Sequence, residues 1–331
     1  MNQVIVGLVA LIAFATALFT TPYVRRLALN VGMLDATGER RMHDQPKPRI
    51  GGIAVYLGFS FALFSALGYL IQTKQFGDLA NLHDLIGLIF GGTLILMVGI
   101  WDDVMGMSPR AKLTAQVLVA AISMLYGFKI QFIANPIHHD TIYFAGWVQI
   151  VVTMLWYVGM MNAINFIDGL DGLLSGVTVI SALSLIAVDL MRGHAEIALI
   201  LAALAGGALG FLRYNWNPAK IILGDSGALF IGYVFATVSI IGASKTAFAI
   251  SLLVPLLVLG LPVVDTAASI VRRTRAGKKF YEADRGHFHH QLIFRFGLNV
   301  RQAVLLIYAV CIALGLVALL LTSGYAPLHV A

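Results

Sequence analysis

The chain has 331 residues, of which 59% are hydrophobic and 11% are charged, and its formal net charge is +6. In ordinary soluble domains roughly a quarter of the residues are charged. This composition therefore excludes a water-soluble globular protein and indicates a membrane protein. The single cysteine, Cys311, excludes an intrachain disulfide and a cysteine-rich metal site.

Apolar runs of about 20 residues, the length that crosses a hydrocarbon core, recur from end to end of the chain. They are continuous and not alternating, which favours helices over the strands of a membrane barrel. We therefore predict an all-α polytopic integral membrane protein with one domain over residues 1–331. The first apolar run lacks the basic residues and cleavage site of a secretory signal, so we interpret it as a retained span. The ten predicted transmembrane helices are residues 3–24, 51–72, 85–101, 111–128, 147–163, 173–191, 196–212, 227–244, 247–270 and 302–322.

Basic residues are distributed unevenly between these spans. The segments 25–50, 102–112, 213–226 and 271–301 hold 18 of the 22 Lys and Arg residues. Because cytoplasmic loops carry an excess of Lys and Arg, we place these segments in the cytoplasm and both termini outside. The outer segment 129–146 has strand-like residues and is predicted to form a small hairpin. We expect a lipid bilayer, and no nucleic acid, as the surroundings of the basic loops.

Acidic and amide side chains gather at the predicted cytoplasmic helix ends. One such residue is most simply a helix cap, but several carboxylates near the hydrocarbon boundary are costly unless they face a polar cavity, a partner or an ion. We therefore predict a cytoplasmic active-site cleft. Its candidate residues are Asp102, Asp103, Asn162, Asn165, Asp168, Asp171 and Asp225.

The first motif is WDDVMGMSPRAK, in which Asp102 and Asp103 end one predicted helix and Lys112 begins the next. Two adjacent carboxylates do not both ionise cheaply without a compensating cation or metal. The pattern suits a region that handles phosphate and metal, and the alternative is a solvated turn at a frayed helix end.

The second motif is NAINFIDGLDG, residues 162–172, whose polar residues recur every three positions. On a continuous helix such residues lie along one ridge. We therefore expect Asn165, Asp168 and Asp171 to point together. The motif lacks the spacing and terminal Glu of an EF-hand calcium loop.

The third motif is ILGDSG, with Asp225 between glycines before the eighth predicted span. The string GDSG also occurs around serine-protease nucleophiles, but no matching triad order surrounds it here. At the start of a helix, Asp225 and the loop amides are expected to serve a metal and a diphosphate.

The fourth motif is the basic loop RRTRAGKKFYEADRGHFHHQL. Attraction to anionic lipid explains Arg272 to Lys279. It does not explain His287, His289 and His290, whose spacing suits donors to a phosphate or sugar. A transition-metal site is the alternative, but it has no obvious fourth ligand.

Together these motifs resemble the polyprenyl-phosphate N-acetylhexosamine-1-phosphate transferase family, and the match runs over nearly the whole chain. The strings that carry it are PRIGG (48–52), DDVMGMSPRAK (102–112), NAINFIDGLDG (162–172), GDSG (224–227) and HFHH (287–290). The resemblance implies ten or eleven helices, a cytoplasmic cleft and Mg²⁺, for which Mn²⁺ can substitute.

The HFHH string is similar to the branch that uses UDP-N-acetylglucosamine, whereas the phospho-N-acetylmuramoyl-pentapeptide transferase branch usually has three consecutive histidines. The resemblance thus implies transfer of N-acetylglucosamine 1-phosphate to undecaprenyl phosphate, with release of UMP, at a bacterial inner membrane. Another UDP-N-acetylhexosamine donor remains the alternative within the family, and a membrane transporter remains the alternative outside it. The oligomeric state is open, a homodimer included.

The resemblance also assigns roles to residues. Asp225 and Asn165 match magnesium-binding positions, and Asp102 matches the candidate base or lipid-phosphate partner. The other acids at catalytic positions are Asp103, Asp168 and Asp171. The matched substrate-binding residues are Lys112, Asn162, Arg285, His287, His289 and His290.

Overall fold

The computed structural model describes residues 3–35, 46–73, 79–134, 141–245, 259–275 and 288–323. The helices in these ranges are α1 (Gln3–Val31), α2 (Gly52–Gln72), α3 (Leu79–Met105), α4 (Pro109–Leu125), α5 (Gly146–Ile167), α6 (Leu173–Met191), α7 (Ala195–Asn215), α8 (Gly224–Lys245), α10 (Gly260–Arg275), α11 (Phe288–Phe294) and α12 (Val300–Ser323). The strands are β1 (Leu34–Asp35), β2 (Lys47–Pro48), β3 (Phe132–Ala134) and β4 (Thr141–Tyr143).

Within the described residues, 8 helices are long and apolar enough to cross a membrane: α1, α2, α3, α5, α6, α7, α8 and α12. Each coincides with one of the ten predicted spans, which confirms a polytopic helical membrane protein. The predicted span 111–128 corresponds to α4, whose 17 residues are at the short end of the usual crossing length and which is not among these 8 helices. The predicted span 247–270 falls partly outside the described residues, and α10 covers its last part.

Several helices continue beyond their predicted ends on the side that carries the acids. Helix α1 runs to Val31, α3 to Met105 and α5 to Ile167. The predicted spans stopped where the apolar run stopped, but backbone hydrogen bonding does not require apolar side chains and continues through polar residues. Asp102 and Asp103 therefore lie within the last turn of α3, and their directions are fixed by that helix.

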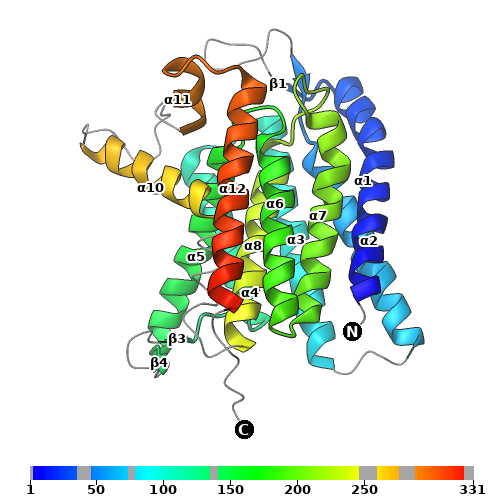
Figure 1. Ribbon diagram of the computed structural model, residues 1–331, viewed down its shortest axis with the longest axis vertical. Coiled ribbons are helices and arrows are strands. Elements are labelled where there is room, and N and C mark those ends of the chain that lie inside the picture. The colour runs from blue at the N-terminus through cyan, green and yellow to red at the C-terminus, as the bar shows by residue number, and fades with distance from the viewer. Residues whose placement is uncertain are drawn as a thin grey trace.

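Helix α8 occupies the centre of the bundle and is almost entirely buried. It packs against α3 and α5, and the fully buried Phe230, Tyr233 and Phe235 fill the space around it. Helices α1, α2, α7, α6 and α12 pack in sequence beside one another around this centre (Figure 1). A central helix with little freedom to shift is a rigid base for residues at its first turn.

The two ends of the bundle differ (Figure 1). The start of α1, the end of α12 and the hairpin β3–β4 lie at the lower end, and the antiparallel pairing of β3 with β4 confirms the hairpin predicted for residues 129–146. The β1–β2 pair, the end of α7 and the start of α12 lie at the upper end. The start of α1 and the end of α12 thus lie on the same side of the bundle, and the start of α8, which carries Asp225, lies on the opposite side.

Candidate active site

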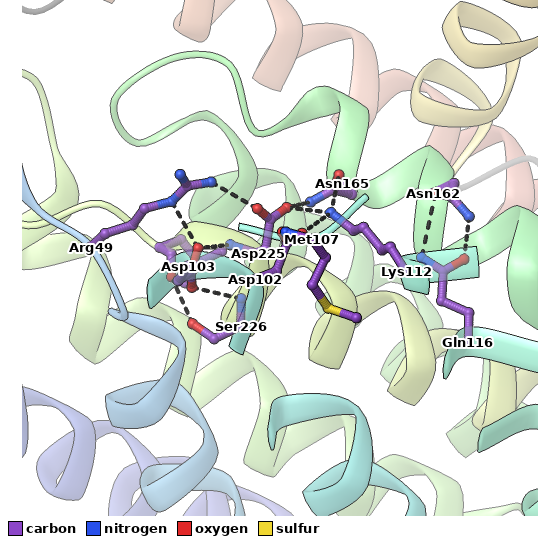
Figure 2. Close-up of polar contacts among 11 residues, drawn as sticks. Arg49, Asp102, Asp103, Met107, Lys112, Gln116, Asn162, Asn165, Asp225 and Ser226 are labelled. Carbon is purple, nitrogen blue, oxygen red and sulfur yellow. Dashed lines mark hydrogen bonds and ion pairs between the residues drawn. The ribbon is translucent and has the colours of Figure 1, made fainter. Parts of the chain in front are cut away.

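Asp225, in the first turn of α8, is the centre of a cluster of charged and amide side chains (Figure 2). Its Oδ1 accepts hydrogen bonds from Lys112 Nζ at 2.7 Å and from Asn165 Nδ2 at 2.5 Å. Its Oδ2 accepts from Arg49 Nη2 at 2.7 Å. The three donors come from the start of α4, the end of α5 and the segment after β2, so the cluster requires the folded bundle.

Asp102 extends the cluster through Lys112. Lys112 Nζ lies 2.9 Å from Asp102 Oδ2 as well as 2.7 Å from Asp225 Oδ1, so one ammonium bridges two carboxylates. Asp102 Oδ1 also accepts from the Met107 N–H at 2.7 Å, which fixes the turn between α3 and α4. Asp102 and Lys112 both keep some exposure to solvent, so a ligand can reach them.

Asp103 faces the other way, into the protein. Its side chain is fully buried, and its two oxygens accept the backbone N–H groups of Asp225 and Ser226 at 2.8 and 2.9 Å. Arg49 Nε lies 2.7 Å from its Oδ1. Asp103 therefore satisfies the unpaired amides at the start of α8. The expectation that these amides bind a diphosphate was wrong, because Asp103 already occupies them.

The prediction that the polar residues of 162–172 lie along one helical ridge was also wrong beyond Ile167. Helix α5 ends at Ile167, so Asp168 and Asp171 belong to the turn before α6 and not to the helix that carries Asn165. Asp171 Oδ2 lies 2.8 Å from Lys47 Nζ and accepts from the Ala219 N–H at 2.9 Å. Residues spaced three apart lie on one face only where the helix is continuous.

Asp168 is half-buried near the Asp225 cluster. Burial and the negative charge of Asp225 raise the pKa of Asp168 to about 8, against the opposing effect of Arg49. At neutral pH this carboxyl group is therefore mostly protonated and able to donate a hydrogen bond.

Asn162 lies one turn before the cluster and pairs with a neighbour on α4. Its Nδ2 donates to Gln116 Oε1 at 2.6 Å and to the Val158 carbonyl at 2.8 Å. The fully buried Gln116 thus holds α5 against α4 at the level of the site.

The basic loop that carries the predicted substrate-binding histidines is only partly described by the structure. Arg285 and His287 lie outside the described residues. His289 and His290 lie in helix α11, and the structure describes their backbone but not their side chains. The N–H of Phe288 donates to Asp265 Oδ1 at 2.9 Å, which attaches the start of α11 to α10.

Arg49 belongs to the cluster, although sequence reasoning gave it no role. Burial lowers the pKa of its guanidinium, but Asp103 and Asp225 outweigh that effect and the net shift is upward. Backbone hydrogen bonds from Gly51 and Gly52 to the carbonyls of Ile222 and Leu223 hold its segment beside the start of α8. The string PRIGG was the available signal, since it was already one of the strings that carried the resemblance.

The charges of the cluster are unbalanced. Three carboxylates, those of Asp102, Asp103 and Asp225, face two cations, Arg49 and Lys112. Surplus carboxylate and an amide oxygen suit a divalent cation such as Mg²⁺. Among the described residues no three acidic, His or Cys side chains converge as a ready-made metal site. Both oxygens of Asp225 already contact cations, so metal binding there requires Lys112 or Arg49 to release it.

The fold and this cluster define a polytopic membrane protein with a partly buried charged site at one end of its bundle. The chain matches the model of glycosyl transferase family 4 over residues 85–243, which include Asp102, Lys112, Asn165 and Asp225. It is 35% identical over 315 residues to the probable undecaprenyl-phosphate N-acetylglucosaminyl 1-phosphate transferase of Bacillus subtilis (strain 168), with 95% of this chain and 84% of the relative covered.

Two further relatives have similar descriptions. The decaprenyl-phosphate N-acetylglucosaminephosphotransferase of Mycolicibacterium smegmatis is 36% identical over 322 residues, covering 91% of this chain and 78% of the relative. The undecaprenyl-phosphate alpha-N-acetylglucosaminyl 1-phosphate transferase of Escherichia coli (strain K12) is 28% identical over 308 residues, covering 88% and 77%. The chain belongs to glycosyl transferase family 4 and is a membrane transferase.

Proposed function

We propose that the protein transfers N-acetylglucosamine 1-phosphate from UDP-N-acetylglucosamine to a polyprenyl phosphate, undecaprenyl phosphate in the first instance. The products are UMP and a polyprenyl-diphosphate-linked N-acetylglucosamine, as in the first membrane step of cell-envelope polysaccharide synthesis. The observation that carries the proposal is the convergence of Lys112, Asn165 and Arg49 on Asp225 at one end of a membrane bundle. The activities for which the relatives are named support the same reaction.

The reaction brings together two anions, a lipid phosphate and a sugar diphosphate. An oxygen of the lipid phosphate attacks the phosphorus that bears the sugar, a new phosphoanhydride bond forms, and the bond to UMP breaks. Lys112 and Arg49 offset the negative charge of the reactants. Asp102, which retains some exposure beside Lys112, orients the lipid phosphate or accepts its proton.

Mg²⁺ fits the charge balance of this site, with Asp225 and the Asn165 amide oxygen as its protein ligands. When bound, the ion would neutralise diphosphate charge. Two protein ligands make a weak site in the absence of substrate, and Mn²⁺ would serve in the same place. Asp103 and Asp171 act as positioning residues in this proposal, since their buried side chains hold the start of α8 and the loop before it.

The charge distribution supports a membrane protein whose site faces the cytoplasm, where UDP-sugars are made. The bacterial relatives support a location in the bacterial plasma membrane. A transporter is less consistent with the structure, because the charged cluster lies at helix ends and not at the bundle's midplane. Release of UMP that depends on both UDP-N-acetylglucosamine and polyprenyl phosphate, measured with the purified protein, tests the proposal. Equal or faster turnover of UDP-N-acetylmuramoyl-pentapeptide would contradict the donor, and no UMP release with any UDP-N-acetylhexosamine would contradict the reaction.

A further inference from the structure

A cavity lies at the same end of the bundle as the Asp225 cluster, where α7 ends and α12 begins (Figure 1). Its volume is about 480 Å³, within the range of small-molecule sites. None of the residues that line it contacts Asp225 through its side chain. Its wall is instead stabilised by Asn217, whose carbonyl accepts from Arg301 Nε at 3.1 Å and whose Nδ2 donates to Asp171 at 3.1 Å.

The lining of this cavity is positively charged. Arg213, Lys220 and Arg301 all border it and are all exposed. Among the described residues, none of those that line it is acidic. Tyr214 and Trp216 also line it, and such aromatic residues are enriched at the membrane–water interface. The cavity is therefore suited to an anionic group at the level of lipid headgroups.

Apolar surface continues from the cavity toward the middle of the bundle. Leu209 precedes Arg213 by one helical turn and is 45% exposed, and Leu305 follows Arg301 by one turn and is 54% exposed. Residues four apart lie on the same helix face. Because α7 ends and α12 begins at this end (Figure 1), both leucines lie on the bilayer side of their arginines. A free anion would make no contact with these apolar side chains, whereas the acyl chains of a lipid would pack against them.

We propose that this cavity binds the phosphate headgroup of an anionic membrane phospholipid, with the acyl chains along the exposed faces of α7 and α12. Arg213 and Lys220 contact the phosphate, and Arg301 both contacts it and holds the loop. The bound lipid would brace the α7–α8 loop, which leads directly to Asp225.

Native mass spectrometry of the full-length protein in detergent, titrated with phosphatidylglycerol, tests this proposal. The variant Arg213→Gln/Lys220→Gln removes two exposed charges and leaves Arg301 in place. We expect its apparent affinity for phosphatidylglycerol to fall by about tenfold or more, because each basic residue contributes appreciably to attraction of anionic lipid. We expect Arg26→Gln/Arg295→Gln, which removes the same charge from exposed positions elsewhere, to stay within about twofold of the parent.

Four outcomes would overturn the proposal. Equal loss in both double variants would show unspecific attraction, and equal binding of phosphatidylcholine would show that charge is not recognised. Displacement of phosphatidylglycerol by millimolar inorganic phosphate would assign the cavity to a free anion. Displacement by equimolar polyprenyl phosphate would assign it to the acceptor lipid. If the double variant fails to fold, the single change Arg213→Gln, at an exposed residue, replaces it in the same titration.

Discussion

At Asp225, one carboxylate accepts hydrogen bonds from three side chains that are far apart in the sequence. Lys112 and Asn165 were expected to lie near it, because the resemblance placed all three in one site. Arg49 was not expected, because a lone arginine in a loop with six basic residues does not stand out by charge or spacing. Its role depends on backbone pairing between residues 51–52 and 222–223, which the sequence does not show.

Asp225→Asn is expected to lower UMP release by at least about a hundredfold, since loss of charge stabilisation in the transition state costs several kcal/mol. The variant should remain folded, because the change creates no core cavity. Asp84→Asn is the matched control, since Asp84 lies at the start of α3, away from the cluster, and it should retain activity. Near-normal magnesium-dependent turnover by Asp225→Asn would show that Asp225 is not a metal ligand and would make Asp102 the leading candidate.

Arg49→Gln is expected to destabilise the protein, because it leaves the fully buried Asp103 carboxylate without its guanidinium partner. Breaking a buried ion pair by removing one partner costs on the order of 3 kcal/mol. Combining Arg49→Gln with Asp103→Asn should cost less than the sum of the two single changes, since the unpaired charge is then absent. Thermal unfolding of all three variants in detergent measures this, and strictly additive losses would mean that the pair is not coupled.

Asp168 is expected to make stability fall as pH rises. Its pKa is raised to about 8 in the folded protein, against about 3.9 in an unfolded chain. Its contribution to stability is therefore complete below about pH 4 and is lost progressively as pH rises through about 8. Asp168→Asn removes this titration, so the fall in Tm between about pH 6 and 9, measured with EDTA and without substrate, should become shallower. An unchanged slope would contradict the raised pKa.

At the scale of elements, the apolar runs predicted most helices because a span must be long and continuously apolar to cross the bilayer. The rule does not settle whether the 17-residue α4 crosses the bilayer. It failed at the helix ends, where polar residues continue the hydrogen bonding. It also misled the interpretation of residues 162–172, since periodicity does not reveal that α5 ends at Ile167. The turn after α5 is held by contacts with distant residues, such as that of Asp171 with Lys47, which periodicity does not reveal.

The start of α8 is expected to tolerate no side chain at Gly224. This residue has φ +76°, and an added Cβ would lie 2.6 Å from Asp103 Oδ2. Gly224→Ala should therefore displace Asp103 from the amides of Asp225 and Ser226, lowering both Tm and turnover. Gly7→Ala is the control, because nothing lies within 4 Å of an added Cβ there, and helix propensity favours alanine. Equal Tm for the two variants would contradict this account of the α8 start.

At the scale of the whole molecule, the charged cluster lies at one end of the bundle. Buried α8 carries Asp225 at one end, and α3, α4, α5 and the segment after β2 deliver its partners to that same end. The start of α1 and the end of α12 lie at the opposite end. The sequence predicted this polarity from the positions of its basic residues, which is an electrostatic rule and does not depend on knowing how the helices pack.

The end of the bundle that carries Asp225 is expected to face the cytoplasm. Cys311 is buried and is the only cysteine, so Cys311→Ala provides a background for single reporter cysteines. Thr73, after α2, and Arg110, in the first turn of α4, are both exposed and lie at opposite ends of the bundle. With a membrane-impermeant maleimide, Thr73→Cys should be labelled in intact spheroplasts, and Arg110→Cys only after lysis. The positive-inside rule supplies the reason, because the Arg110 loop belongs to the basic side. The reverse pattern would place the Asp225 cluster outside, where no cytoplasmic UDP-sugar reaches it, and would contradict the proposed donor as well as the orientation.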